Sequence, residues 1–78
     1  MSKIISLVEL KKEQEAEIIS IAAGWRATKR LADLGLVPET KIKILRNAPI
    51  LGPIEIQVRG SRVVIGRGLA SKILIKLI

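Results

Sequence analysis

The feature that most constrains the fold is a helical pattern that stops abruptly within the stretch LADLGLVPET, residues 31–40. Upstream of the stop, Ala27, Leu31 and Leu34 recur at spacings of four and three, and charged residues fill most of the intervening positions. This spacing predicts an amphipathic helix of about three turns that begins at Trp25 and packs these three apolar side chains on the core.

Three residues explain why the helix stops there. Gly35 adopts a left-handed conformation at no steric cost and closes the helix, and Leu36 just beyond it can fold back onto the last turn. Pro38 cannot continue a helix and favours extended geometry in the residue before it. The stretch is therefore predicted to be a helix C-cap that leads through a tight turn into a strand, with Leu36 as a buried plug.

Most of the remaining chain alternates apolar and polar residues, which is the pattern of half-buried strands. The predicted strands cover residues 16–22, 41–46, 54–59, 62–65 and 73–77. A short turn at 60–61 makes a hairpin, 47–53 forms a loop, 66–72 forms a single helical turn, and the residues before 16 form a tether or a single turn. The fold class is therefore mostly β, a small curled sheet or barrel of about five strands with one inserted α-helix and a short helical turn before the last strand.

Composition sets the size and the expected location of the domain. A chain of 78 residues is expected to form a single domain over residues 1–78, because chains this short bury only roughly 60% of their unfolded surface. The hydrophobic fraction is 49% and Trp25 is the single aromatic residue, so the core must be aliphatic. The chain has no cysteine, and a cytoplasmic location is expected. No apolar run approaches the roughly 20 residues that cross a bilayer, so membrane insertion is not expected.

The charge balance indicates the kind of partner. Fourteen Lys and Arg residues against seven acids give a net charge of +7, which suits an acidic protein, nucleic acid or an anionic lipid surface. Lipid binding would need a polybasic cluster or an apolar anchor helix, and neither is evident. Nucleic-acid binding remains the alternative to a protein partner, but the single Trp gives little surface for stacking bases.

The residue types exclude several kinds of chemistry. The chain has no His and no Cys, so no metal site is expected and iron carriage by this chain is disfavoured. Glu13, Glu15 and Glu17 alternate and could share a strand face, which favours a solvated edge over a hard-cation site. The serines have no histidine to activate them, and the glycines at 66–68 match no phosphate-binding motif. The sequence therefore predicts a binding module with no cofactor rather than an enzyme.

The best candidate for a partner-binding surface is the predicted helix. Arg26, Lys29 and Arg30 should gather on its outward side, with Trp25 at its start, and Trp and Arg dominate interface hot spots. Such a face would suit an acidic groove of a partner protein. The structural alternative is that Trp25 covers the open end of the barrel and the cations form a solvated face.

A second candidate surface is apolar. Alternation along the later strands leaves Val64, Leu74 and Ile78 on the face opposite to the core, where they would either form an interface patch or lie under the helix. Self-association through an unpaired strand edge is a further possibility.

Residues along essentially the whole chain carry a family resemblance. They are Leu10, Ile18, Ile21, Arg30-Leu31, Leu34-Gly35-Leu36, Pro38-Glu39-Thr40, Pro49, Pro53-Ile54-Glu55-Ile56 and Val58-Arg59-Gly60. In this order they resemble the FeoA family, small cytoplasmic proteins of bacterial ferrous iron transport. The resemblance implies an SH3-like barrel and an accessory role beside a membrane transporter that carries its own cytosolic GTPase domain. The same barrel is also the C-terminal domain of some iron-dependent repressors.

The chain departs from the usual family pattern at two turns. Lys12-Glu13 stands where Pro-Gly is common before the first strand, and Glu39 replaces the frequent Gly after Pro38. Both departures concern turn geometry. The leading hypothesis is therefore a regulatory or scaffolding protein that docks on the cytosolic part of a ferrous iron transporter, with a nucleic-acid-binding small barrel as the alternative.

Overall fold

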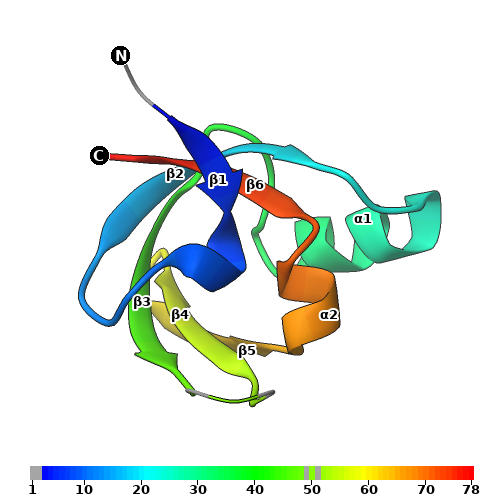
Figure 1. Cartoon of the computed structure of the whole chain (residues 1–78). Helices are drawn as coiled ribbons and strands as arrows, with labels where there is room; N and C mark the ends of the chain where they lie inside the picture. Colours follow the sequence, from blue (N-terminus) through cyan, green and yellow to red (C-terminus); the bar gives the residue numbers. More distant parts are fainter. Residues whose placement is uncertain (1–2, 49, 51) are drawn as a thin grey trace.

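The computed structural model describes residues 3–48, 50 and 52–78, and Figure 1 shows the arrangement of its elements. Strands and short helices alternate along this part of the chain. In order they are β1 (Ile4–Ser6), the 3-10 turn η1 (Leu7–Glu9), β2 (Glu15–Ile21), α1 (Trp25–Asp33), β3 (Lys41–Asn47), β4 (Ile54–Val58), β5 (Ser61–Ile65), α2 (Arg67–Ala70) and β6 (Ile73–Leu77). Of the predicted loop over 47–53, Pro49 and Leu51 lie outside the described residues.

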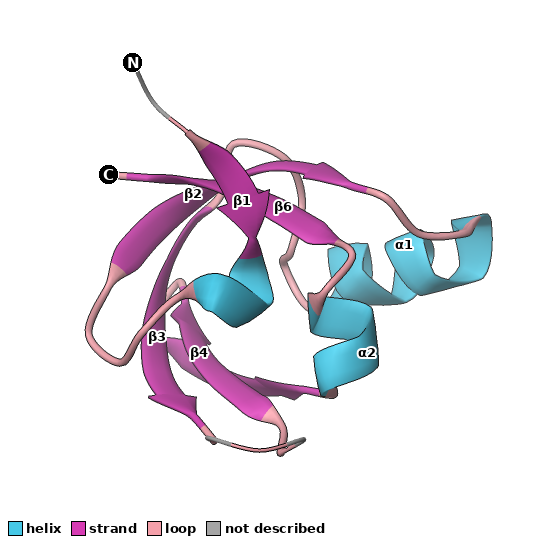
Figure 2. Ribbon diagram, in the orientation of Figure 1, coloured by secondary structure: helices cyan, strands magenta, loops and turns pink. Residues whose placement is uncertain are grey.

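The strands form one antiparallel sheet in the order β1-β6-β2-β3-β4-β5, which curls around the interior of the molecule (Figure 2). The register shifts in β2 between Ile18 and Ser20, and in β3 between Ile44 and Arg46. Shifts of this kind bend a strand and increase its twist, so they let a six-stranded sheet curl back on itself. The order ends at β1 and β5, which are the two edges of an open sheet.

β1 departs from the prediction of a tether or a single turn before residue 16. Ile4 pairs with Lys76 and Ser6 pairs with Leu74, so β1 adds a strand beside β6 and the sheet has six strands instead of about five. A strand of three residues is too short to show alternation, and its partner lies at the other end of the chain. The expected single turn is η1, which begins with a capping box between Ser6 and Glu9.

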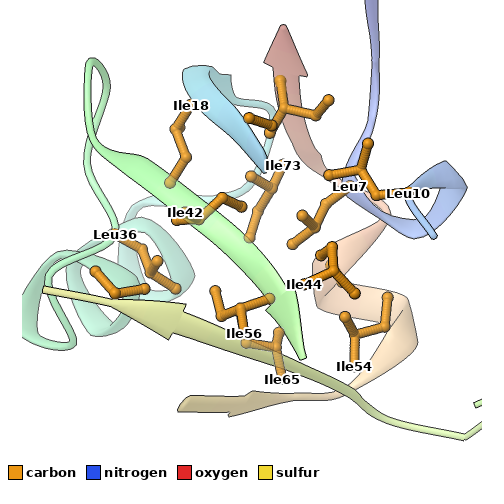
Figure 3. Packing of buried hydrophobic residues seen from close by; sticks show 14 of the residues in the cluster. Leu7, Leu10, Ile18, Leu36, Ile42, Ile44, Ile54, Ile56, Ile65 and Ile73 are labelled. Atoms are coloured by element: carbon orange, nitrogen blue, oxygen red, sulfur yellow. The ribbon is translucent and has the colours of Figure 1, made fainter. Parts of the chain in front are cut away.

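The core is aliphatic, as the composition requires. Figure 3 shows isoleucines of β2 to β6, together with leucines of η1 and the loops, pointing toward one another inside the curl. In β2 the inward residues are Ala16 and Ile18. The fully buried large side chains are Leu7, Leu10, Ile18, Leu31, Leu36, Ile44, Ile54, Ile56, Ile73 and Ile75.

The end of α1 follows the prediction except at one residue. Gly35 has a φ of +89°, and the Leu36 N–H donates to the Leu31 carbonyl at 2.8 Å, so the chain folds back at the predicted point. Leu36 is 0% exposed, which confirms the buried plug. The expectation that Leu34 packs on the core is wrong, because Leu34 is 46% exposed. It occupies the C-cap position after the last helical residue, and Leu36 fills the core beneath the helix instead.

A polar link joins the end of β3 to η1 and α2. The Asn47 Nδ2 atom donates to the carbonyls of Val8 at 3.0 Å and Leu10 at 2.7 Å. The Arg67 Nη2 atom donates to Asn47 Oδ1 at 2.5 Å and to the Ala48 carbonyl at 2.6 Å. Side-chain hydrogen bonds therefore hold these three segments together where no strand pairing does.

Candidate protein-docking site

Helix α1 is attached to the sheet by a narrow contact. Of its nine residues only Leu31 is fully buried, while Ala27 and Thr28 are half-buried. The Thr28 hydroxyl donates to the Ala23 carbonyl at 3.2 Å, which ties the first turn to the preceding loop. In Figure 1 the helix stands to one side of the curled sheet, so most of its surface is open to solvent.

The helical period gathers the four predicted contact residues on the outward side of α1. Trp25, Arg26, Lys29 and Arg30 are all exposed, and we call this set the α1 face. The Lys29 Nζ atom lies 5.4 Å from the centroid of the Trp25 ring, within cation–π range. One turn of helix separates the two residues, so this contact follows directly from their spacing in the sequence.

Trp25 is 75% exposed, so it does not cover the open end of the barrel. The exposed cations are equally what a solvated face would show, so the use of α1 as a contact surface stays a prediction. The largest apolar side chain of the chain is thus left in solvent, held at the first position of a helix. An exposed aromatic side chain on a regular element is pre-positioned to anchor a partner at low entropic cost.

The cations of the α1 face are available for a partner. The ion pairs within the described part of the chain are Lys43–Glu13 at 3.5 Å and Arg62–Glu55 at 3.2 Å, and neither involves α1. Asp33, at the C-terminal end of the helix and outside the α1 face, is the one acid of α1 and is exposed. Three positive charges against this one negative charge make the helix surface electropositive, most strongly in its N-terminal half.

The second candidate surface is dispersed over the sheet. Val64 is 55% exposed and Ile78 is 67% exposed, whereas Leu74 is half-buried beside its β1 partner Ser6. In the sheet order, β2, β3 and β4 separate β5 from β6. The three residues therefore do not belong to neighbouring strands.

The acidic residues before and within β2 do not form a shared row of three. Glu13 precedes β2, lies in a turn with a φ of 78° and pairs with Lys43. Glu15 and Glu17 lie in β2 opposite Lys43 and Lys41 of β3. In the described ranges 3–48, 50 and 52–78, no group of three or more His, Cys, Asp or Glu residues is arranged to hold a metal ion.

Two features of the surface were not foreseen from the sequence. Shallow hollows lie over β3 and the end of β4, and both are lined by Lys41 and Arg59. These residues are eighteen positions apart in the chain and are brought together only by strand pairing.

The described helices include none that is long and apolar enough to cross a membrane.

Both turns that depart from the family pattern have the geometry that glycine favours. Glu13 and Glu39 have φ values of 78° and 72°, in the left-handed region. The backbone therefore keeps the glycine-like conformation at these two turns although the side chains differ. The departures change the side chain and the strain of each turn, and they leave the fold intact.

Comparisons with known proteins agree with this structure. The model of the FeoA domain family matches residues 5–77. A protein of Methanocaldococcus jannaschii named "Putative Fe(2+) transport protein A" is 39% identical over 66 residues, which are 85% of this chain and 78% of that protein.

Solved structures with the same fold fall into two groups. A crystal structure of an iron uptake regulatory protein (FeoA) is 32% identical, has a TM-score of 0.91, and covers 97% of this chain and 100% of its own. The solution structure of FeoA from Chlorobium tepidum is 39% identical with a TM-score of 0.87, covering 95% of this chain and 70% of its own. A manganese-dependent transcriptional repressor has a TM-score of 0.90 but 15% identity, and 44% of its chain is covered, so it shows the fold alone.

These findings confirm the predicted fold class, a mostly β, small SH3-like fold with one inserted helix and a helical turn before the last strand. The family match extends over nearly all of the residues that the structure describes. On the strength of that match and of the related protein from M. jannaschii, the chain belongs to the FeoA family.

Proposed function

We propose that this protein is a cytosolic accessory protein of ferrous iron uptake that docks, through the α1 face, on the cytosolic part of a membrane ferrous iron transporter. The observation that carries the proposal is Trp25, which is 75% exposed on a helix that only one buried side chain, Leu31, anchors to the sheet. The family membership supplies the biological setting, and the GTPase domain of such a transporter is the proposed partner.

The energetics favour Trp25 as the anchor of such a complex. A buried Trp removes about 150–250 Å² from water, which at about 25 cal/mol per Å² corresponds to roughly 4–6 kcal/mol before the costs of association. Those costs absorb much of the gain, so removal of a central Trp typically weakens binding by about 2 kcal/mol or more. The three cations around it would steer the approach of an acidic surface and make association faster at low salt.

The proposed role is binding without catalysis. The chain offers no histidine or cysteine to activate a nucleophile or to hold iron, so its contribution would be made through contact with the transporter. The likeness to metal-dependent repressors concerns the fold alone. No feature of the α1 face beyond its charge favours nucleic acid, since single-stranded nucleic acid needs several aromatic side chains for stacking.

Calorimetric titration of the intact chain into the purified cytosolic domain of the transporter tests the proposal. We expect saturable binding that Trp25→Ala weakens by at least about tenfold, equivalent to about 1.4 kcal/mol. Neutralising Arg26, Lys29 and Arg30 together should weaken it further and reduce its dependence on salt. The matched control neutralises Lys11 and Lys12, which are exposed away from α1, and should leave the affinity nearly unchanged.

A nonspecific DNA duplex serves as the parallel titrant. Binding to DNA alone, with a steep dependence on salt, would replace the docking proposal with the nucleic-acid alternative. No binding to the cytosolic domain, repeated with the intact transporter in membrane, would refute docking altogether.

A further inference from the structure

The outer face of the sheet carries a row of charged side chains whose sign alternates from strand to strand, except at the last residue of the row. Lys76 of β6 lies opposite Glu17 of β2, and Glu17 in turn lies opposite Lys41 of β3. The next strand, β4, pairs Val58 with Ile42, so Arg59 follows beside Lys41 at the end of the ladder. Lys41 and Arg59, both positively charged, are therefore neighbours at a point where continued alternation of charge would place an acid. Adjacent like charges repel each other and are unfavourable.

The surroundings of these two cations are concave. One shallow hollow is lined by the turn residues 37–40 together with Lys41 and Arg59, and a second is lined by Lys41, Arg59 and neighbouring residues of β2, β3 and the β4–β5 turn. Because both hollows share Lys41 and Arg59, they meet at the cation pair. We call the two hollows together the β3–β4 furrow.

Neither Lys41 nor Arg59 forms an ion pair with an acid in the described part of the chain. The ion pairs in residues 3–48, 50 and 52–78 join Lys43 to Glu13 and Arg62 to Glu55. Glu39 lines one hollow and Glu15 lines the other, but neither forms an ion pair there. The furrow is therefore positive at its centre, with Glu39 at one end and with Glu15 opposite Lys43 at the other.

The walls of the furrow are held in place before any partner arrives. The Glu39 N–H donates to the Ile18 carbonyl at 2.7 Å, and the Thr40 carbonyl accepts from the Ile18 N–H at 2.9 Å, so the turn is fixed to β2. Thr40 is only 7% exposed. On the other side, Arg59 has a φ of 49°, a strained conformation that non-glycine residues keep mainly where the surrounding structure enforces it.

From this arrangement we infer that the β3–β4 furrow is a binding site for a carboxylate side chain of an extended protein segment, with the carboxylate placed between Lys41 and Arg59. The positive centre selects an acidic residue, and Glu39 at one end disfavours a second acid beside it. Pro38 is exposed and Val37 half-exposed at one end, which adds an apolar contact for the segment. The site is separate from the α1 face, and the inference stands whether or not the partner is the transporter.

The test is an NMR titration of the intact ¹⁵N-labelled chain at constant ionic strength. The probe is a capped pentapeptide with one central glutamate between uncharged residues, and the control peptide has glutamine in its place. We expect the glutamate peptide to shift resonances of residues 37–41 and 57–60 saturably, and the glutamine peptide to have no such effect. Inorganic phosphate is titrated in parallel, as a small anion with no peptide chain.

Four variants make the test specific. Arg59→Ala and Lys41→Gln should each weaken binding of the glutamate peptide by about two- to fivefold, the range of an exposed ion pair. Glu39→Gln should strengthen it, because it removes an acid from the wall of the furrow. Lys12→Gln removes one positive charge at an exposed residue that lines neither hollow, and it should change nothing.

Three results would overturn the inference. Equal shifts with both peptides would show binding that does not depend on the carboxylate. Shifts spread over α1 as much as over the furrow would show charge attraction without a site. Phosphate that binds the furrow as tightly as the peptide would assign it to small anions. If no probe shifted the resonances of the furrow while the spectrum showed a folded chain, the furrow would not bind a carboxylate side chain, and the inference would be wrong.

Discussion

Replacing Asn47 with alanine should destabilise the protein far more than its position at the end of a strand suggests. Its Nδ2 atom donates to two carbonyls, those of Val8 and Leu10, and its Oδ1 atom accepts from the Arg67 guanidinium. A hydrogen bond between neutral groups contributes about 1 kcal/mol net, and one with a charged partner about 1.5–3 kcal/mol. The three together give an expected loss of roughly 3.5–5 kcal/mol.

The magnitude is large for a domain of this size. Small domains are stable by about 5–15 kcal/mol, and each kcal/mol lowers the melting temperature by about 4–8 °C in a chain of 60–100 residues. Asn47→Ala should therefore melt at least about 14 °C lower. Part of the effect arises because the Leu10 carbonyl, on a residue that is 1% exposed, would lose its Asn47 donor.

Urea denaturation of the wild type, of Asn47→Ala and of Gln57→Ala measures the difference directly. Gln57 is an exposed amide on the same sheet, and its removal should change the free energy of unfolding by no more than about 0.5 kcal/mol. If Asn47→Ala cost less than about 1 kcal/mol, the polar link would not hold β3, η1 and α2 together as described. The strand pairings alone would then account for the fold.

Three further predictions concern stability and assembly. Leu36→Ala should cost about 2–5 kcal/mol in urea denaturation, whereas Leu34→Ala at the exposed C-cap should cost less than about 1 kcal/mol, and equal losses would contradict the assigned burial. Gly35→Ala should lose about 1–2 kcal/mol because its φ is +89°, while Glu39→Gly should relieve a similar strain and raise the melting temperature. Sedimentation over a concentration series should show a monomer, because the edge strands are short and β5 carries Arg62; a dimer at micromolar concentration would indicate pairing of edges.

The parts of the fold that were predictable depend on signals local in the chain. Gly35 and Leu36 mark the end of α1 within two residues, and the turn at Gly60 marks the β4–β5 hairpin. β1 was not predictable in this way, because its three residues acquire a strand partner only when β6 is in place. Leu34 was misassigned because its helical spacing suits the core, although the helix ends one residue earlier.

The same distinction between local and long-range signals applies to the candidate sites. The four residues of the α1 face could be grouped from helical periodicity, since Trp25 and Lys29 lie one turn apart and meet in the structure. The exposure of Trp25 could not be predicted, because it depends on where the whole helix rests against the sheet. The β3–β4 furrow was invisible in the sequence for a related reason, since Lys41 and Arg59 become neighbours only through strand pairing.

The central claim, that Trp25 anchors a complex with the transporter, is tested most directly at the Trp25 ring itself. Trp25 is the single aromatic residue of the chain, so a chain labelled with 5-fluorotryptophan has one ¹⁹F resonance, and the free chain should show the full solvent isotope shift of an exposed ring. Addition of the unlabelled cytosolic domain of the transporter should move this resonance and abolish its sensitivity to exchange of H₂O for D₂O. Saturable binding, measured by calorimetry on the same sample, that leaves the resonance and its isotope shift unchanged would contradict the claim.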